Sequence, residues 1–73
     1  MKNVINTQKL IEARGERSRS AVAAEIGVTR QQIWNYENGT SEPPISVLCD
    51  LARFYKIDLN DLLNDKNFSI ASN

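Results

Sequence analysis

Apolar residues recur along the chain at the three- and four-residue spacing of helices, and no stretch alternates between apolar and polar positions as a strand does. The clearest stripe runs through residues 45–55, and it predicts a helix with one core-facing side. Glycines and polar capping residues separate the segments. The pattern predicts an all-α fold of five short helices, over residues 7–14, from a Ser18 cap to 26, and over 30–37, 45–55 and 59–63.

Three of these helix starts share one arrangement, in which an apolar residue precedes a polar cap and faces a second apolar residue five positions later. The pairs are Ile5 with Leu10 around Asn6, Val28 with Ile33 around Thr29, and Ile57 with Leu62 around Asp58. Gln32 follows Thr29 by three residues and can return a hydrogen bond to the backbone amide of the cap. We therefore expect a capping box at Thr29.

The second and third helices are separated only by residues 27–29, so we expect them to cross sharply. Ala23 is small where two helix axes would come closest, and Gly27 permits a left-handed turn. The buried wedge between them would be Val22, Ile26, Val28 and Ile33. The alternative is a plain helical hairpin, which would not need both a small residue and a glycine. The spacing therefore predicts a helix-turn-helix over residues 19–38.

The third helix turns a polar face away from Ile33 and Tyr36. In the major groove, arginine can bond two acceptors of guanine, and glutamine or asparagine can bond a donor and an acceptor of adenine. The expected base-reading residues are Arg30, Gln31, Asn35 and Trp34. Solvated surface residues could give the same pattern, but the place of this face on the second helix of the turn favours double-stranded DNA as the partner.

Composition excludes several other functions. The chain has no histidine and a single cysteine, so it lacks an internal disulfide, the commonest metal ligand and the usual base for a nucleophile. We expect no enzyme activity, no metal and no cofactor. Cys49 should be a packing or surface residue and not a redox switch. The polar first eight residues do not form a signal peptide, and no run approaches the ~18 apolar residues of a membrane span. A cytoplasmic protein without membrane contact is expected.

Net charge is zero, which by itself argues against a nucleic-acid partner. The charges are unevenly placed, however. Residues 1–35 hold six basic and three acidic side chains, whereas residues 36–73 hold three basic and six acidic ones. Because of its excess of basic side chains, the N-terminal half is the half suited to binding the phosphates of a nucleic acid.

Residues 10–63 resemble the Cro/cI-type (Xre-family) helix-turn-helix regulators of transcription. The positions that carry the likeness are Arg14, Ser18, Val22, Ala23, residues 26–29, Ile33, residues 37–39, Pro43, Leu48, Leu51, Ala52 and residues 59–62. The resemblance implies a compact lambda-repressor-like bundle of five helices, with helix 3 in the major groove and usually a homodimer on a palindromic operator. The DNA-binding domain would span residues 1–63, followed by a polar tail, residues 64–73.

The resemblance also assigns roles by position. It places Arg30, Gln31 and Asn35 at base-contacting sites, Thr29 and Asn38 at backbone-contacting sites, and Ser18 and Arg19 at the start of helix 2. Family members commonly have a glutamine there that bonds a phosphate, and Arg19 could do so with added charge. Arg14 and Glu37 match a pair that joins helix 1 to the end of helix 3, which we assign to the scaffold.

The chain departs from the family in the loop after helix 3, where basic residues are common. Glu42 should repel phosphate, while Thr40 and Ser41 can still bond it, so we expect a shallow salt dependence of DNA binding. Trp34 is also unusual on the reading face. Its ring should pack on a thymine methyl or a deoxyribose; the alternatives are packing on a neighbouring helix or stacking on Arg30.

Two further expectations concern protein partners. Tyr55 continues the core stripe, so its neighbour Phe54 should point elsewhere. The expected dimer patch is Phe54, Leu59, Leu63, Phe68 and Ile70. The competing function is an antitoxin or protein-interaction module that uses its acidic half and its C-terminal tail to hold another protein.

Overall fold

The computed structural model describes residues 5–63, which form four α-helices and one 3-10 helix. These elements are α1 (Thr7–Arg14), α2 (Arg19–Ile26), α3 (Arg30–Asn38), α4 (Ile45–Tyr55) and η1 (Leu59–Leu62). The predicted all-α class is confirmed, and helix bounds agree closely with the sequence pattern. The count of five helices is not confirmed, because the structure has four α-helices and its last element is a 3-10 helix of four residues.

The predicted caps are present at the helix starts. The side chains of Asn6 and Ser18 accept hydrogen bonds from the backbone amides of Lys9 and Ala21. At α3 the capping box is complete: Thr29 Oγ1 accepts from the amide of Gln32 at 3.0 Å, and Gln32 Oε1 accepts from the amide of Thr29 at 2.8 Å. Local chemistry thus fixes where the helices of the helix-turn-helix begin.

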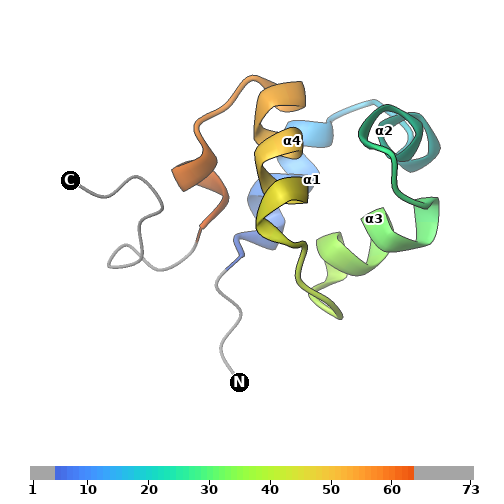
Figure 1. The fold of residues 1–73 in the computed structure, drawn as a ribbon, viewed down its shortest axis with the longest axis horizontal. Helices are drawn as coiled ribbons and strands as arrows, with labels where there is room; N and C mark the ends of the chain where they lie inside the picture. Colours follow the sequence, from blue (N-terminus) through green and yellow to red (C-terminus); the bar gives the residue numbers. More distant parts are fainter. Residues whose placement is uncertain (1–4, 64–73) are drawn as a thin grey trace.

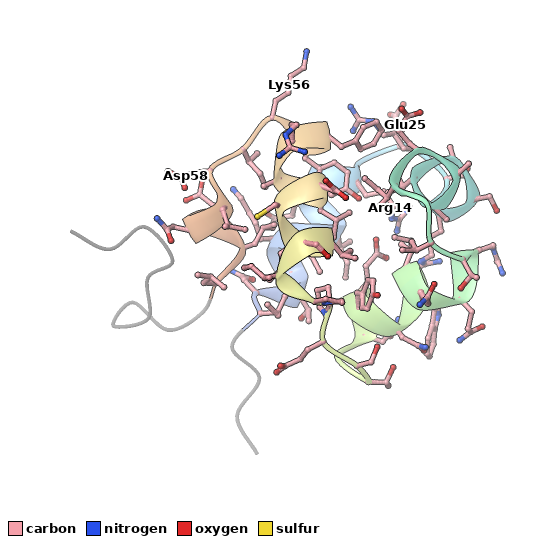
Figure 2. The ribbon with its side chains drawn as sticks, in the orientation of Figure 1. Arg14, Glu25, Lys56 and Asp58 are labelled. Carbon is pink, nitrogen blue, oxygen red and sulfur yellow. The ribbon has the colours of Figure 1, made fainter. Side chains whose placement is uncertain are left out.

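Left-handed residues end α2, α3 and α4. Gly27 has φ 89° and Gly39 has φ 74°, a region that side chains disfavour. A Cβ at Gly27 would meet no atom within 4 Å, so glycine is required there by the backbone conformation and not by lack of space. Lys56 ends α4 with φ 60° although it is not a glycine. Its side chain extends into solvent beyond the end of the helix (Figure 2).

The core draws on all five elements. Its buried apolar residues are Ile5, Leu10, Val22, Ala23, Ile33, Tyr36, Leu48, Leu51, Ala52, Leu62 and Leu63. Figure 1 shows α4 in front of α1, with α2 and α3 on one side and η1 on the other. The expected wedge residues Ile26 and Val28 are partly buried and pack against this cluster. The two helices of the helix-turn-helix therefore pack against the same core as the other elements.

The two ends of the described chain meet. Ile5 and Leu63 form an isolated antiparallel bridge, and the amide of Asn6 donates to the carbonyl of Leu62 at 2.7 Å. Leu63 has an extended conformation to make this bridge, so the helical turn of η1 stops at Leu62. This long-range pairing explains why the last element is short.

Within residues 5–63, the members of the expected dimer patch do not share one exposed surface. Leu63 is buried in the core, and Phe54 packs beside Tyr55 and beneath the guanidinium of Arg17. Leu59 is partly buried against the core, while Phe68 and Ile70 lie outside the described residues. The prediction is wrong for Leu63, because it is buried in the core. Phe54 is only partly buried, so its place in a dimer interface stays a prediction.

Candidate nucleic-acid interface

Helices α2 and α3 are joined by a tight turn and cross one another. The amides of Gly27 and Val28 both donate to the carbonyl of Ala23, at 2.8 and 3.0 Å, which turns the chain back at the end of α2. Figure 1 shows α2 nearly end-on and α3 closer to the plane of the page, so the helices do not run side by side. Ala23 and Ile33 are buried between them and the core. The predicted helix-turn-helix is therefore present.

A buried carboxylate holds the start of α2 to the end of α3. Glu37 lies in the last turn of α3 with 2% of its side chain exposed, and it accepts from two arginines. Arg14 Nε donates to Glu37 Oε2 at 2.7 Å, which is the pair that the family resemblance implied. Arg19 Nε donates to Glu37 Oε1 at 3.0 Å. One carboxylate thus joins α1, α2 and α3.

Arg19, the expected phosphate ligand, is held by that carboxylate through its Nε. Its side chain is 30% exposed, and its two terminal nitrogens have no partner among residues 5–63. A guanidinium bound in this way can still direct its terminal N–H groups to a phosphate. The Arg19–Glu37 contact was missed in the sequence, because it forms only when α2 and α3 pack together.

The outward face of α3 carries the expected base-reading residues. Arg30, Gln31 and Trp34 are exposed, and Asn35 is half-buried. Arg30 has no partner in the described part of the chain. Trp34 is 40% exposed, and the cation-π contacts found within residues 5–63 involve Arg17, not Arg30. A free guanidinium and an exposed indole therefore share one face of the second helix.

Three polar side chains of this region are bonded to one another. Gln31 Nε2 donates to Asn35 Oδ1 at 3.2 Å, and Thr40 Oγ1 donates to the same oxygen at 3.1 Å. Thr40 also donates its backbone amide to the carbonyl of Asn35 at 3.0 Å, and its hydroxyl lies 3.3 Å from that carbonyl. Both donors of Thr40, an expected phosphate ligand, are thus engaged by Asn35.

The other expected phosphate ligands differ in which hydrogen-bond donors they still have available. The hydroxyl oxygens of Ser18 and Thr29 accept capping bonds, which leaves each hydroxyl proton available to a phosphate. Asn38 Nδ2 donates to the carbonyl of Trp34 at 2.9 Å, and its second amide proton is available. Ser41 is exposed and has no hydrogen bond within residues 5–63.

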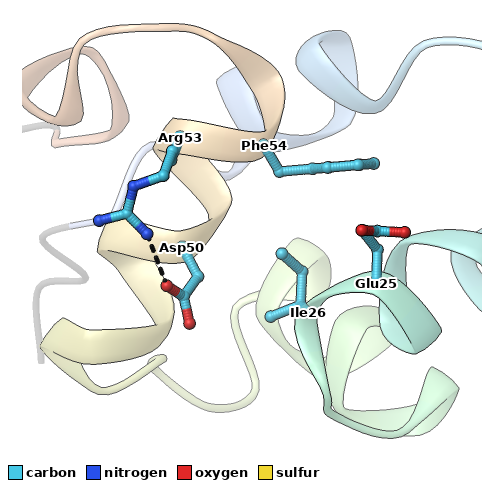
Figure 3. A pocket seen from close by; sticks show the side chains of 5 residues that line it. All are labelled: Glu25, Ile26, Asp50, Arg53 and Phe54. Carbon is cyan, nitrogen blue, oxygen red and sulfur yellow. Dashed lines mark hydrogen bonds and ion pairs between the residues drawn. The ribbon is translucent and has the colours of Figure 1, made fainter.

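A shallow groove lies away from this face, between α2 and α4. Its volume is about 300 Å³, and it is lined by Glu25, Ile26, Asp50, Arg53 and Phe54. Figure 3 shows Phe54 and Ile26 on opposite sides of it, and Asp50 bonded to Arg53. Because Arg53 partly neutralises Asp50, the groove has little net charge to select a ligand.

Tyr55 lies where three charged side chains meet. Burial raises the pKa of Tyr55 to about 12, the Glu37 carboxylate adds to the rise, and Arg14 and Arg17 oppose it. In the unfolded chain the pKa of this phenol is near its ordinary value of 10.0. The unfolded state therefore loses its proton first as the pH rises, and this group's contribution to stability is lost between about pH 10 and 12.

We expect Tyr55→Phe to remove part of the alkaline instability of the domain. Chemical unfolding followed by circular dichroism at pH 8, 10 and 11 should give a smaller fall in the free energy of unfolding for the variant than for the original chain. Comparison of the two proteins isolates the effect of Tyr55 from that of every other side chain. An equal fall in both would contradict the role of burial at this phenol.

Comparison with known proteins agrees with this geometry. The family model described as helix-turn-helix matches residues 10–62, which covers all of α2, α3, α4 and η1 and residues 10–14 of α1. No curated protein matches the chain. Within residues 5–63, no helix has the length and apolar character to cross a membrane, and no group of three candidate ligand side chains is placed to hold a metal. The chain belongs to the helix-turn-helix family of the Xre/Cro-cI type, a family of DNA-binding regulators of transcription.

Proposed function

We propose that this protein is a sequence-specific transcriptional repressor that binds a palindromic operator as a homodimer, with α3 in the major groove. The observation that carries the proposal is the outward face of α3, where the guanidinium of Arg30 is exposed and unpaired beside Gln31 and Trp34. Helix-turn-helix proteins read base edges with this face. Two copies would present their α3 helices about 34 Å apart, one turn of DNA.

The proposed mechanism divides the contacts between the two helices. The start of α2, with Ser18 and Arg19, would bind a phosphate and set the position of the domain on the duplex. Arg30 would then bond a guanine through two donors, and Trp34 would pack on a thymine methyl. Occupation of a promoter by the dimer would block transcription. Ser41 and the hydroxyl of Thr29 would supply further phosphate contacts.

Replacement of Arg30 by alanine tests the proposed contact between Arg30 and a guanine. Sites are first enriched from a random pool of duplex DNA with the full chain. Arg30→Ala should then reduce discrimination at one base pair of the enriched site by roughly 5- to 150-fold, the range for a lost two-donor contact. Fluorescence anisotropy with the enriched duplex and its single-base variants measures the effect.

Arg53→Ala is the matched control, since it removes the same charge from the exposed side of α4, where Arg53 bonds Asp50 at 3.0 Å. It should leave base discrimination unchanged. If both variants weakened all sequences alike, Arg30 would be a general phosphate ligand and not a reader of bases.

The competing function, an antitoxin or protein-interaction module, rests on the acidic C-terminal half and on the tail of residues 64–73, and the tail lies outside the described residues. It stays a prediction. The same selection separates the two functions, because failure to enrich any DNA sequence would favour the interaction module over the repressor.

A further inference from the structure

The hydrogen bonds around Asn35 change which side chains are free to read a base. A carbonyl oxygen has two lone pairs, and both of those on Asn35 Oδ1 are occupied. One accepts from Gln31 Nε2 at 3.2 Å and the other from Thr40 Oγ1 at 3.1 Å. The Asn35 side chain therefore bonds both Gln31, on the outward face of α3, and Thr40, in the loop after α3.

This arrangement disfavours the adenine contact expected of Asn35. That contact needs an amide oxygen to accept from N6 and an amide nitrogen to donate to N7. Asn35 would have to give up at least one of its oxygen's two hydrogen bonds to supply the oxygen. Gln31, in contrast, keeps its Oε1 and its second Nε2 proton free, which are the two groups that adenine requires.

We propose that Asn35 and Thr40 are positioning residues for Gln31, and that Gln31 alone of the three selects adenine. Asn35 fixes the direction of the Gln31 amide, and the Thr40 hydroxyl fixes Asn35. Thr40 then influences base choice without touching DNA, in place of the phosphate contact first expected. This inference rests on the proposed function, since it assigns roles within the same DNA-reading face.

The geometry of the loop holds Thr40 in place beside Asn35. Its backbone amide donates to the carbonyl of Asn35 at 3.0 Å, just after the left-handed turn at Gly39. This bond does not involve the side chain, so it persists when the hydroxyl is removed. Thr40→Val thus deletes one hydrogen bond to Asn35 Oδ1 while it keeps the loop and the volume of the side chain.

The test compares Kd values for the enriched duplex and for a duplex with the adenine read by Gln31 changed to guanine. The base pair is first located as the one whose discrimination Gln31→Ala abolishes. Thr40→Val should lower discrimination at that pair by about 2- to 10-fold, the range for loss of one hydrogen bond, and leave other pairs unchanged. Thr40→Ser, which keeps the hydroxyl, should retain the original discrimination.

A double-mutant cycle separates this role from a phosphate contact. In the Gln31→Ala background, Thr40→Val should have no further effect, because the residue it positions is gone. An undiminished effect in that background, or equal weakening on every sequence, would overturn the proposal. So would a preference for guanine at the Gln31 base pair, since Gln31 would then be acting as a donor only.

A measurement on the free protein covers the case in which no DNA site is enriched. NMR relaxation of the Gln31 and Asn35 side-chain amides should show restricted motion in the original chain and greater motion in Thr40→Val. If the amides are restricted but no site is enriched, the bonded network stands while the repressor function and the base-reading role of Gln31 fail. If the amides move freely in both proteins, the positioning role is overturned whether or not DNA binds.

Discussion

Replacement of Glu37 by alanine is expected to lower the free energy of unfolding by about 3 to 5 kcal/mol, the range for removal of one partner from a buried ion pair. Glu37 is almost fully buried and bonds both Arg14 and Arg19. Its loss leaves two guanidinium groups without their acceptor, one of them with only 15% of its side chain exposed. Urea unfolding followed by circular dichroism measures the change.

Asp50→Ala provides the matched control. It also removes a carboxylate bonded to an arginine, at 3.0 Å, but the side chains of Arg53 and Asp50 are 76% and 46% exposed. Exposed pairs contribute only about 0.2 to 1 kcal/mol. If the two variants lost the same small amount, the Glu37 carboxylate would have no special part in holding the three helices together.

Leu62→Ala should destabilise the domain by about 2 to 5 kcal/mol, as for other fully buried leucines. Leu62 lies in the short element η1 but has no exposed surface, and its carbonyl accepts from the amide of Asn6. The cavity would open between η1 and the remainder of the core. Thermal and urea unfolding, monitored together, would test whether the domain still unfolds in one step.

Leu59→Ala is the same substitution in the same turn, at a partly buried position. Because less apolar area is lost from the interior, its cost should be closer to about 1 kcal/mol. Equal losses at the two positions would mean that η1 is not packed as the structure describes. A much larger loss for Leu62 would establish this turn as part of the folding unit.

The helix boundaries could be predicted because their causes are local. Asn6, Ser18 and Thr29 each bond an amide three residues away, so the sequence contains both partners within one turn. The type of the last element could not be predicted in the same way. It depends on Leu63 pairing with Ile5, and no short window of sequence contains both residues.

The outward face of α3 shows the same contrast between local and long-range causes. Periodicity placed Arg30, Gln31 and Trp34 on the outer side of α3, and the structure exposes all three. Periodicity could not show that Thr40 would turn back to Asn35, since this depends on the conformation of Gly39. Nor could it bring Arg17 over Phe54, a contact between a loop and a distant helix.

The Arg19–Glu37 contact has a consequence for how a chain of zero net charge binds a polyanion. A long flexible side chain normally loses rotational freedom when it meets its ligand, at a cost of about 0.5 to 1.5 kcal/mol. Arg19 is anchored at Nε before any DNA is present, so most of that loss has already occurred during folding. If Arg19 binds a phosphate as proposed, its terminal nitrogens would meet that phosphate preorganised. This preorganisation would compensate for weak long-range attraction between the protein and DNA.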